Sequence, residues 1–83
     1  MNNNRFIEKC KKIIKDYNDE HNSDTVSMDE ILVVWSSKTL QNNKALLVTT
    51  TLNGMYYELT YNGDRKELYL DVYKKVAAKQ FDL

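Results

Sequence analysis

The chain has 83 residues, a formal net charge of zero and 42% hydrophobic residues. This length supports a single domain, residues 1–83, with one modest core. The apolar content excludes a disordered chain, and the charge balance disfavours a binding mode driven by long-range attraction to nucleic acid or anionic lipid.

The first residues of the chain and the number of cysteines indicate where in the cell the protein is expected. The first ten residues contain no apolar stretch typical of a signal peptide, and the longest apolar run, residues 31–35, is far too short to span a membrane. Cys10 is the sole cysteine, so neither an internal disulfide nor a cysteine-based zinc site can form within one chain. We therefore expect a soluble protein of a reducing cytoplasm, without membrane association.

Residues 4–20 are predicted to form an amphipathic helix. Apolar side chains recur three and four residues apart, which places them on one helical face. They are Phe6, Ile7, Cys10, Ile13, Ile14 and Tyr17. Asn3 or Asn4 can supply the N-cap oxygen, and Cys10 is expected in the core. The polar connection that follows contains Ser27-x-x-Glu30, a capping-box pattern that allows one helical turn before the next element.

Four strands are predicted from residue 31 onward. The ranges are 31–40, 45–52, 55–61 and 67–73, separated by "QNN" and by the pairs Asn53-Gly54 and Asn62-Gly63. Asn-Gly is the preferred pair for tight hairpin turns, because both positions accept a positive φ. The tail "KKVAAKQFDL" contains good helix formers and is compatible with a short terminal helix.

The predicted fold class is therefore α+β: an N-terminal amphipathic helix packed on a four-stranded antiparallel β-meander, with an optional short C-terminal helix. Alternation places Val33 and Trp35 with Ile31 on the buried face of the first strand. Later strands are expected to bury Tyr57, Leu59, Tyr61, Leu68, Leu70 and Val72. The second strand can bury either Leu46 and Val48 or Ala45 and Leu47.

Motifs for chemistry are absent from the sequence. The stretch "SSKT" at 36–39 lacks the glycines of a phosphate-binding loop, and His21 has neither a cysteine nor a second histidine to complete a metal site. The spacing of Asp24, Asp29 and Glu30 fits no calcium loop. We therefore predict no catalytic residue, no metal, no cofactor and no small-molecule substrate, so the protein is not expected to be an enzyme.

Tyrosines on the last two predicted strands offer the clearest binding signal. If they are exposed, they form an aromatic patch of the kind enriched at protein interfaces; if they are buried, they form core. The candidate interface residues are Lys38, Gln41, Asn42, Tyr56, Tyr69 and Tyr73. An alternative is a small nucleic-acid-binding protein, in which aromatic and basic sheet residues stack on a single strand. The basic residues would be Arg65, Lys66 and Lys74, but Glu58, Glu67 and Asp71 lie among them.

The segments "VVWSSKTLQNNKALL", "NGMYYELTYNGD" and "LDVYKK" together resemble a family of small uncharacterised proteins from phages and prophages of low-GC Gram-positive bacteria. The likeness extends from about Phe6 to Lys75. It implies a compact α+β domain of phage-type origin, located in the cytoplasm of the bacterial host, and transfers no catalytic residues. We expect a non-enzymatic accessory protein that acts by protein–protein binding, with a host factor or a second copy as partner.

Overall fold

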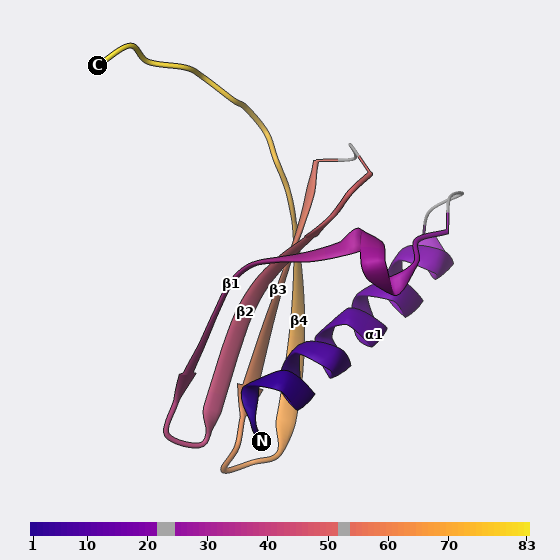
Figure 1. The fold of residues 1–83 in the computed structure, drawn as a ribbon, viewed down its shortest axis with the longest axis vertical. Coiled ribbons are helices and arrows are strands. Elements are labelled where there is room, and N and C mark those ends of the chain that lie inside the picture. The colour runs from indigo at the N-terminus through magenta and orange to yellow at the C-terminus, as the bar shows by residue number, and fades with distance from the viewer. Residues whose placement is uncertain (22–24, 52–53) are drawn as a thin grey trace.

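The computed structural model describes residues 1–21, 25–51 and 54–83. Its elements are α1 (Asn3–His21), the short 3-10 helix η1 (Met28–Glu30), β1 (Ile31–Thr39), β2 (Asn42–Thr49), β3 (Met55–Asn62) and β4 (Glu67–Lys74). The four strands form one sheet in the order β1-β2-β3-β4, and every neighbouring pair is antiparallel. The helix α1 lies diagonally across one face of this sheet (Figure 1). The predicted α+β class and the meander order are confirmed. The predictions that concern Asp24, Leu52 and Asn53 lie outside the described residues.

The apolar face of α1 forms half of the core. Phe6, Cys10 and Ile14 have no exposed surface, and Ile7, Ile13 and Tyr17 pack around them. The helix begins one residue earlier than expected, because Asn2 rather than Asn3 or Asn4 caps it: the Arg5 amide donates to Asn2 Oδ1 at 2.9 Å. This bond satisfies one of the amides that a helix leaves unpaired in its first turn.

Cys10 should be unreactive while the chain is folded. Burial raises the pKa of its thiol to about 12, and only the thiolate attacks alkylating reagents. We expect iodoacetamide to leave the native protein unmodified at neutral pH, over a time in which the denatured chain is fully alkylated. Mass spectrometry with and without guanidinium measures this difference. Equal rates in the two states would mean that the thiol is accessible in the fold.

The capping-box pattern before β1 produces one turn of 3-10 helix, as the sequence indicated. The amide and the hydroxyl of Ser27 each donate to Glu30 Oε1 at 3.0 Å. Both bonds lower the pKa of the Glu30 carboxyl, and the bond from the Ser27 amide has the larger effect. The Thr50 amide donates to the Glu30 carbonyl at 2.8 Å. The turn is therefore tied to the chain just beyond β2, which positions the start of β1.

The sheet face that contacts α1, hereafter the inner face, completes the core. Its fully buried residues are Ile31, Ala45, Leu47, Tyr57 and Leu59. Tyr61, Leu68, Leu70 and Val72 are half-buried on the same face. The expected inner residues of β3 and β4 are thus confirmed, and in β2 the inner set is Ala45 and Leu47, with Leu46 and Val48 on the opposite face. The edge of the Tyr57 ring meets the ring of Tyr17 at a centroid distance of 6.2 Å.

The prediction that Trp35 is a core residue is wrong. The β1–β2 register shifts between Val33 and Trp35, so that Val33 pairs with Leu47 while Trp35 pairs with Leu46. A β-bulge at Val34 therefore inserts one extra residue and moves Trp35 to the face away from α1. Trp35 is 42% exposed. Val33, also expected in the core, is 39% exposed, because it lies on the inner face of β1, an edge strand of the sheet.

The first hairpin turn is shorter than "QNN" suggested. Thr39 pairs with Asn42, so that only Leu40 and Gln41 form the loop, and Leu40 adopts a φ of 55°. Consequently β2 begins at Asn42 rather than Ala45, and it ends at Thr49. Asn43, predicted in the turn, is instead buried on the inner face.

The predicted tight Asn62-Gly63 turn is also wrong in form. Asn62 pairs with Glu67, which leaves a four-residue loop, 63–66. The Asn62 Oδ1 accepts from the amides of Asp64 and Arg65 at 3.1 and 3.3 Å, an Asx-type arrangement that reverses the chain without an Asn-Gly pair at its centre. In the preceding loop, Gly54 does adopt a positive φ of 71°.

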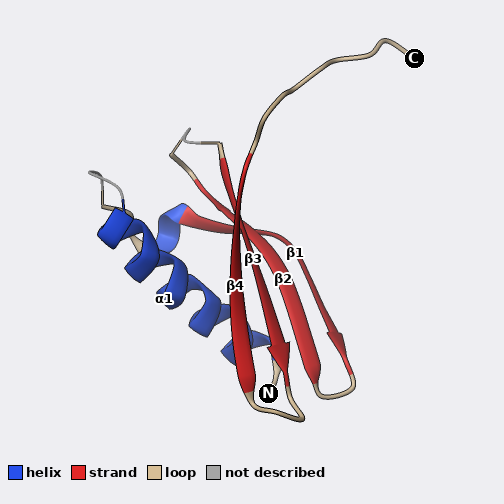
Figure 2. Ribbon diagram, turned by 180° about the vertical axis from the view of Figure 1, so that it is seen from behind, coloured by secondary structure: helices blue, strands red, loops and turns tan. Residues whose placement is uncertain are grey.

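The C-terminal segment 75–83 is extended and forms no helix, so the optional terminal helix is not observed. The Lys75 amide donates to the Gly54 carbonyl at 2.7 Å, which continues the β3–β4 pairing by one residue. Beyond it the segment leaves the end of β4 and curves away from the sheet (Figures 1 and 2). An isolated helix this short is unstable in water unless an apolar face packs against the body of the protein.

Candidate protein-binding face

The sheet face opposite α1, hereafter the outer face, is not covered by any described element (Figure 2). Its side chains follow from the strand register. Across one row lie Leu32 and Val48 on β1 and β2 and the paired Tyr56 and Tyr73 on β3 and β4. The next row contains Trp35, Leu46, Glu58 and Asp71, and the third contains Ser37, Lys44, Thr60 and Tyr69.

Six apolar or aromatic side chains therefore lie together on the outer face: the whole first row and, in the second row, the positions on β1 and β2. We call this set the apolar corner: Leu32, Trp35, Leu46, Val48, Tyr56 and Tyr73. Leu32 is 49% exposed and Tyr73 51% exposed. Scattered apolar residues are ordinary on a protein surface, whereas a contiguous group is typical of an interaction site.

Charges on the outer face are mostly acidic. Glu58 forms an ion pair with Lys44 at 3.6 Å, while Glu67 and Asp71 lie on β4. The Tyr73 hydroxyl donates to Glu58 at 3.5 Å, and the Tyr69 hydroxyl donates to Glu67. The hydrogen bond that the Tyr69 hydroxyl donates to Glu67 raises the pKa of Tyr69, and the negative charge of Glu58 raises the pKa of Tyr73. Both tyrosines are therefore neutral hydrogen-bond donors over the physiological range.

A hollow of about 390 Å³ lies beside Trp35. It is lined by the indole and by polar side chains of β1–β3, including Ser37, Thr39, Lys44 and Thr60. An aromatic wall with several hydroxyls around it can receive an inserted side chain and satisfy its polar groups, as anchor pockets do at protein interfaces.

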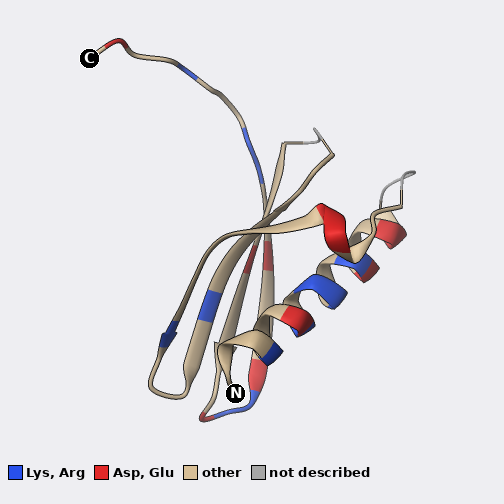
Figure 3. Cartoon of the chain, viewed as in Figure 1, with Lys and Arg blue, Asp and Glu red and all other residues tan. Residues whose placement is uncertain are grey.

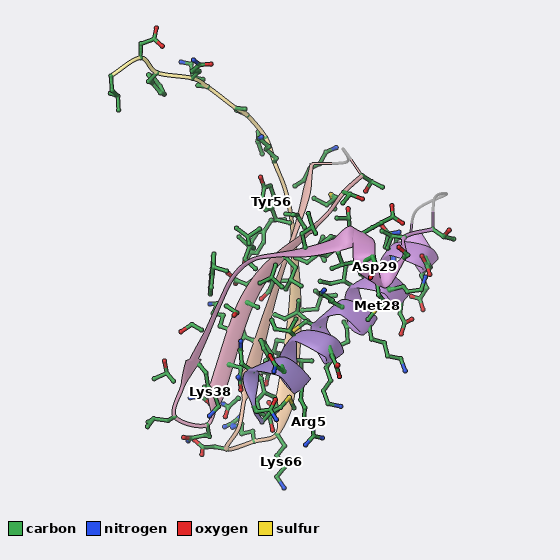
Figure 4. All side chains as sticks on the ribbon, viewed as in Figure 1. Arg5, Met28, Asp29, Lys38, Tyr56 and Lys66 are labelled. Atoms are coloured by element: carbon green, nitrogen blue, oxygen red, sulfur yellow. The ribbon has the colours of Figure 1, made fainter. Side chains whose placement is uncertain are left out.

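The six predicted interface residues fall into two groups. Tyr56, Tyr69 and Tyr73 lie on the outer face, and two of them belong to the apolar corner. The other three are at the opposite end of β1 and β2: Lys38 (labelled in Figure 4) pairs with the inner-face residue Asn43, and its ammonium donates to the Leu40 carbonyl at 3.0 Å. The structure thus pairs Tyr56 with Tyr73, places Tyr69 two rows away on the same face, and leaves Lys38 apart from all three.

Gln41 and Asn42 bind the neighbouring hairpin. Gln41 Nε2 donates to Asp64 Oδ1 at 2.5 Å, and the Gly63 amide donates to Asn42 Oδ1 at 3.1 Å. We call this the tip contact. Gln41 and Asn42 thus hold the two hairpin ends together, and the hydrogen-bonding groups that they use for this contact are not free to bind another molecule.

Sequence reasoning missed four members of the apolar corner: Leu32, Trp35, Leu46 and Val48. A usable signal was present, since "ILVVW" at 31–35 is apolar at every position. A strand with one solvated face shows alternating apolar and polar residues. The absence of this alternation in residues 31–35 indicated that both faces of β1 carry apolar side chains.

Other candidate chemistry is sparse in the described residues. His21 ends α1, stacked on Tyr17 at a centroid distance of 4.1 Å, with Nδ1 2.9 Å from the Tyr17 carbonyl. Within residues 1–21, 25–51 and 54–83, no cluster of three or more His, Cys, Asp or Glu side chains is arranged to hold a metal ion. Over the same ranges no helix has the length and hydropathy needed to cross a membrane.

Comparison with known proteins gives one family. No curated protein matches the chain significantly, and no solved structure does so either. A family of unknown function, DUF6275, matches residues 7–83, which includes all four strands and most of α1. The chain therefore belongs to the DUF6275 family.

Proposed function

We propose that the protein is a non-enzymatic, phage-type accessory protein that binds a protein partner through its outer face. The observation that carries this proposal is the apolar corner, a contiguous group of aliphatic and aromatic side chains that no described element covers. Aromatic anchors beside hydrogen-bonding groups are the usual composition of an interface centre. The resemblance to small phage and prophage proteins makes a host protein the expected partner.

The chemistry of the outer face restricts this partner. Asp71 carries negative charge beside the apolar corner, Glu67 carries a second negative charge at the far end of β4, and Lys44 is already paired with Glu58. A complementary surface would present apolar side chains at its centre and Lys or Arg on the side that meets β4. The hollow beside Trp35 would receive one of the partner's side chains.

Replacing Trp35 by serine is the direct test. We expect the immobilised wild-type protein to retain a defined partner from a lysate of the organism that encodes it, and Trp35→Ser and Tyr73→Ser to reduce that retention by at least about tenfold, as loss of interface anchors does. Both side chains are half-exposed, so circular dichroism should show an unchanged fold.

Met28→Ser is the matched control. Met28 is 38% exposed but lies on η1, on the side of the molecule where α1 packs (Figure 4). Its substitution should leave retention unchanged. If Trp35→Ser retains the same proteins as the wild type, the outer face is not the binding surface.

Binding of single-stranded nucleic acid through the same tyrosines is the second candidate. Tyr56, Tyr69 and Tyr73 lie close enough for stacking, but their charged neighbours Glu58, Glu67 and Asp71 would repel phosphates. Arg65 and Lys66 lie in the loop below the sheet rather than between the tyrosines. If the material retained in the capture experiment is removed by nuclease and by moderate salt, this second candidate replaces the first.

A further inference from the structure

β4 is an edge strand, and in the described structure its far side has no neighbour. The Lys75 amide points toward β3, because it donates to Gly54. Backbone groups alternate in direction along a strand, so the other odd-numbered residues of β4 also direct their amides and carbonyls to β3. The even-numbered residues direct theirs outward, unpaired: Leu68, Leu70, Val72 and Lys74. Such a row is a template for another strand.

Residues 75–83, which we call the tail, are a free segment of chain that could pair with such an edge. The tail has no helix or strand, and its apolar side chains are mostly exposed: Val76 is 96% exposed and Phe81, which lies under the Lys79 ammonium of the same tail, is 73% exposed. The stretch from Lys74 to Lys79 reads "KKVAAK" and contains none of the residues that favour a tight turn. The tail is therefore poorly suited to fold back onto its own β4, and from the end of that strand it curves away from the sheet into solvent (Figure 2).

We propose that two copies of this chain pair antiparallel along residues 67–83, about a two-fold axis at Lys75. The tail of each copy then adds a fifth strand beside β4 of the other copy. Each tail gains a ladder of backbone hydrogen bonds, as in strand addition at a sheet edge. The contact is the same on both copies, so it closes as a dimer. This inference is argued from the edge of the sheet and does not require the outer-face proposal, although its odd-numbered pairs lie at the β4 side of the outer face.

Charge complementarity supports this register. Residues whose numbers sum to 150 lie opposite each other, which puts Lys79 of one copy against Asp71 of the other and Phe81 against Tyr69. These odd-numbered pairs fall on the outer face, at positions where side chains of paired strands approach most closely. Among the described residues Asp71 has no ion-pair partner within 4 Å. Figure 3 shows the acidic positions on β4 and the lysines along the tail.

The opposite face of the same pairing is also complementary. Asp82 falls opposite Leu68, which lines a groove of about 480 Å³ between α1 and β4. Lys9, Lys12 and Lys66 line this groove together with one acidic residue, Asp16, so the carboxylate of Asp82 would enter a region in which positive charges outnumber negative ones. Ala78 and Gln80 would lie beside Val72 and Leu70, whose side chains α1 leaves half-exposed.

The pairing contains one unfavourable contact, since Lys75 meets Lys75 of the second copy at the axis. Like charges directly opposite each other destabilise a strand pair. Replacing Lys75 by threonine, a good strand former, should therefore tighten the dimer. A merely structural role of Lys75 within one copy would give no such gain.

A charge swap measured by sedimentation equilibrium tests the proposal on the full chain. The wild-type mass should rise with concentration from the 9.8 kDa of one chain toward twice that value. Asp71→Lys and Lys79→Asp should each weaken dimerisation on the order of tenfold, because the dimer contains the contact twice. The double variant Asp71→Lys/Lys79→Asp should restore wild-type affinity. Both residues are exposed, so neither change should disturb the fold.

Glu8→Lys, an equal charge change on the exposed side of α1, is the control and should leave the mass unchanged. A monomer at every concentration would overturn the inference, and so would a double variant as weak as the single ones. Trp35→Ser should have no effect on the mass. A result that rejects the dimer therefore does not reject partner binding by the outer face, which the capture experiment tests.

Discussion

Replacing Phe6 by alanine is expected to remove about 3–5 kcal/mol from the free energy of unfolding. Phe6 has no exposed surface and belongs to the core cluster that α1 forms with the sheet. A domain of this size has a total stability of about 4–12 kcal/mol. The variant should therefore be marginally folded or unfolded at room temperature, and a urea titration followed by circular dichroism measures the loss.

Phe81→Ala is the matched control, since it is the same substitution in the exposed tail. Phe81 contacts no core residue in the described structure, so its loss should change the unfolding midpoint of the dilute, monomeric chain by less than about 0.5 kcal/mol. Equal effects of the two substitutions would mean that α1 does not pack on the sheet through Phe6.

Gly63→Ala is expected to be the second large effect, for a steric reason. A Cβ atom at Gly63 would lie 2.1 Å from the Gln41 carbonyl oxygen and 2.7 Å from Gln41 Cβ. The two hairpin ends would have to separate, which breaks the tip contact of Gln41 with Asp64 and of Asn42 with Gly63. We expect a loss of about 1–3 kcal/mol, as for other forced overpacking. For a domain of this size each kcal/mol lowers the melting temperature by about 4–8 °C.

Gly54→Ala separates this steric effect from backbone strain. Gly54 has a positive φ of 71°, but a Cβ there would meet nothing closer than Lys75 Cβ at 3.8 Å. Its replacement should cost only about 1 kcal/mol, the usual penalty for an alanine in the left-handed region. A smaller loss for Gly63→Ala than for Gly54→Ala would mean that the hairpin ends are not in contact in solution.

The parts of the fold that depend on long periodic patterns could be predicted from the sequence. The apolar spacing of residues 6–17 located α1, and the three alternating runs after residue 44 gave the order of the meander. The N-cap was displaced by one residue because Asn2, Asn3 and Asn4 are locally equivalent, and only the helix position relative to the sheet distinguishes them.

The parts that depend on pairing between strands could not be predicted. "QNN" has turn chemistry, yet burial of Ala45 and Leu47 fixed a register in which Leu40 takes a positive φ instead. Side-chain burial outweighed local preference at this turn. The bulge at Val34 has no signature in an apolar run, so alternation placed Trp35 on the wrong face. Of the apolar corner, the two tyrosines were therefore expected on the binding surface, whereas Trp35 and the three aliphatic residues were not.

The bulge at Val34 has a practical consequence. Because it turns Trp35 outward, the chain's sole tryptophan lies in the surface proposed to meet a partner. The protein thus carries an intrinsic optical reporter at that position, and its emission spectrum will register whether water or another molecule surrounds the indole, without any attached dye.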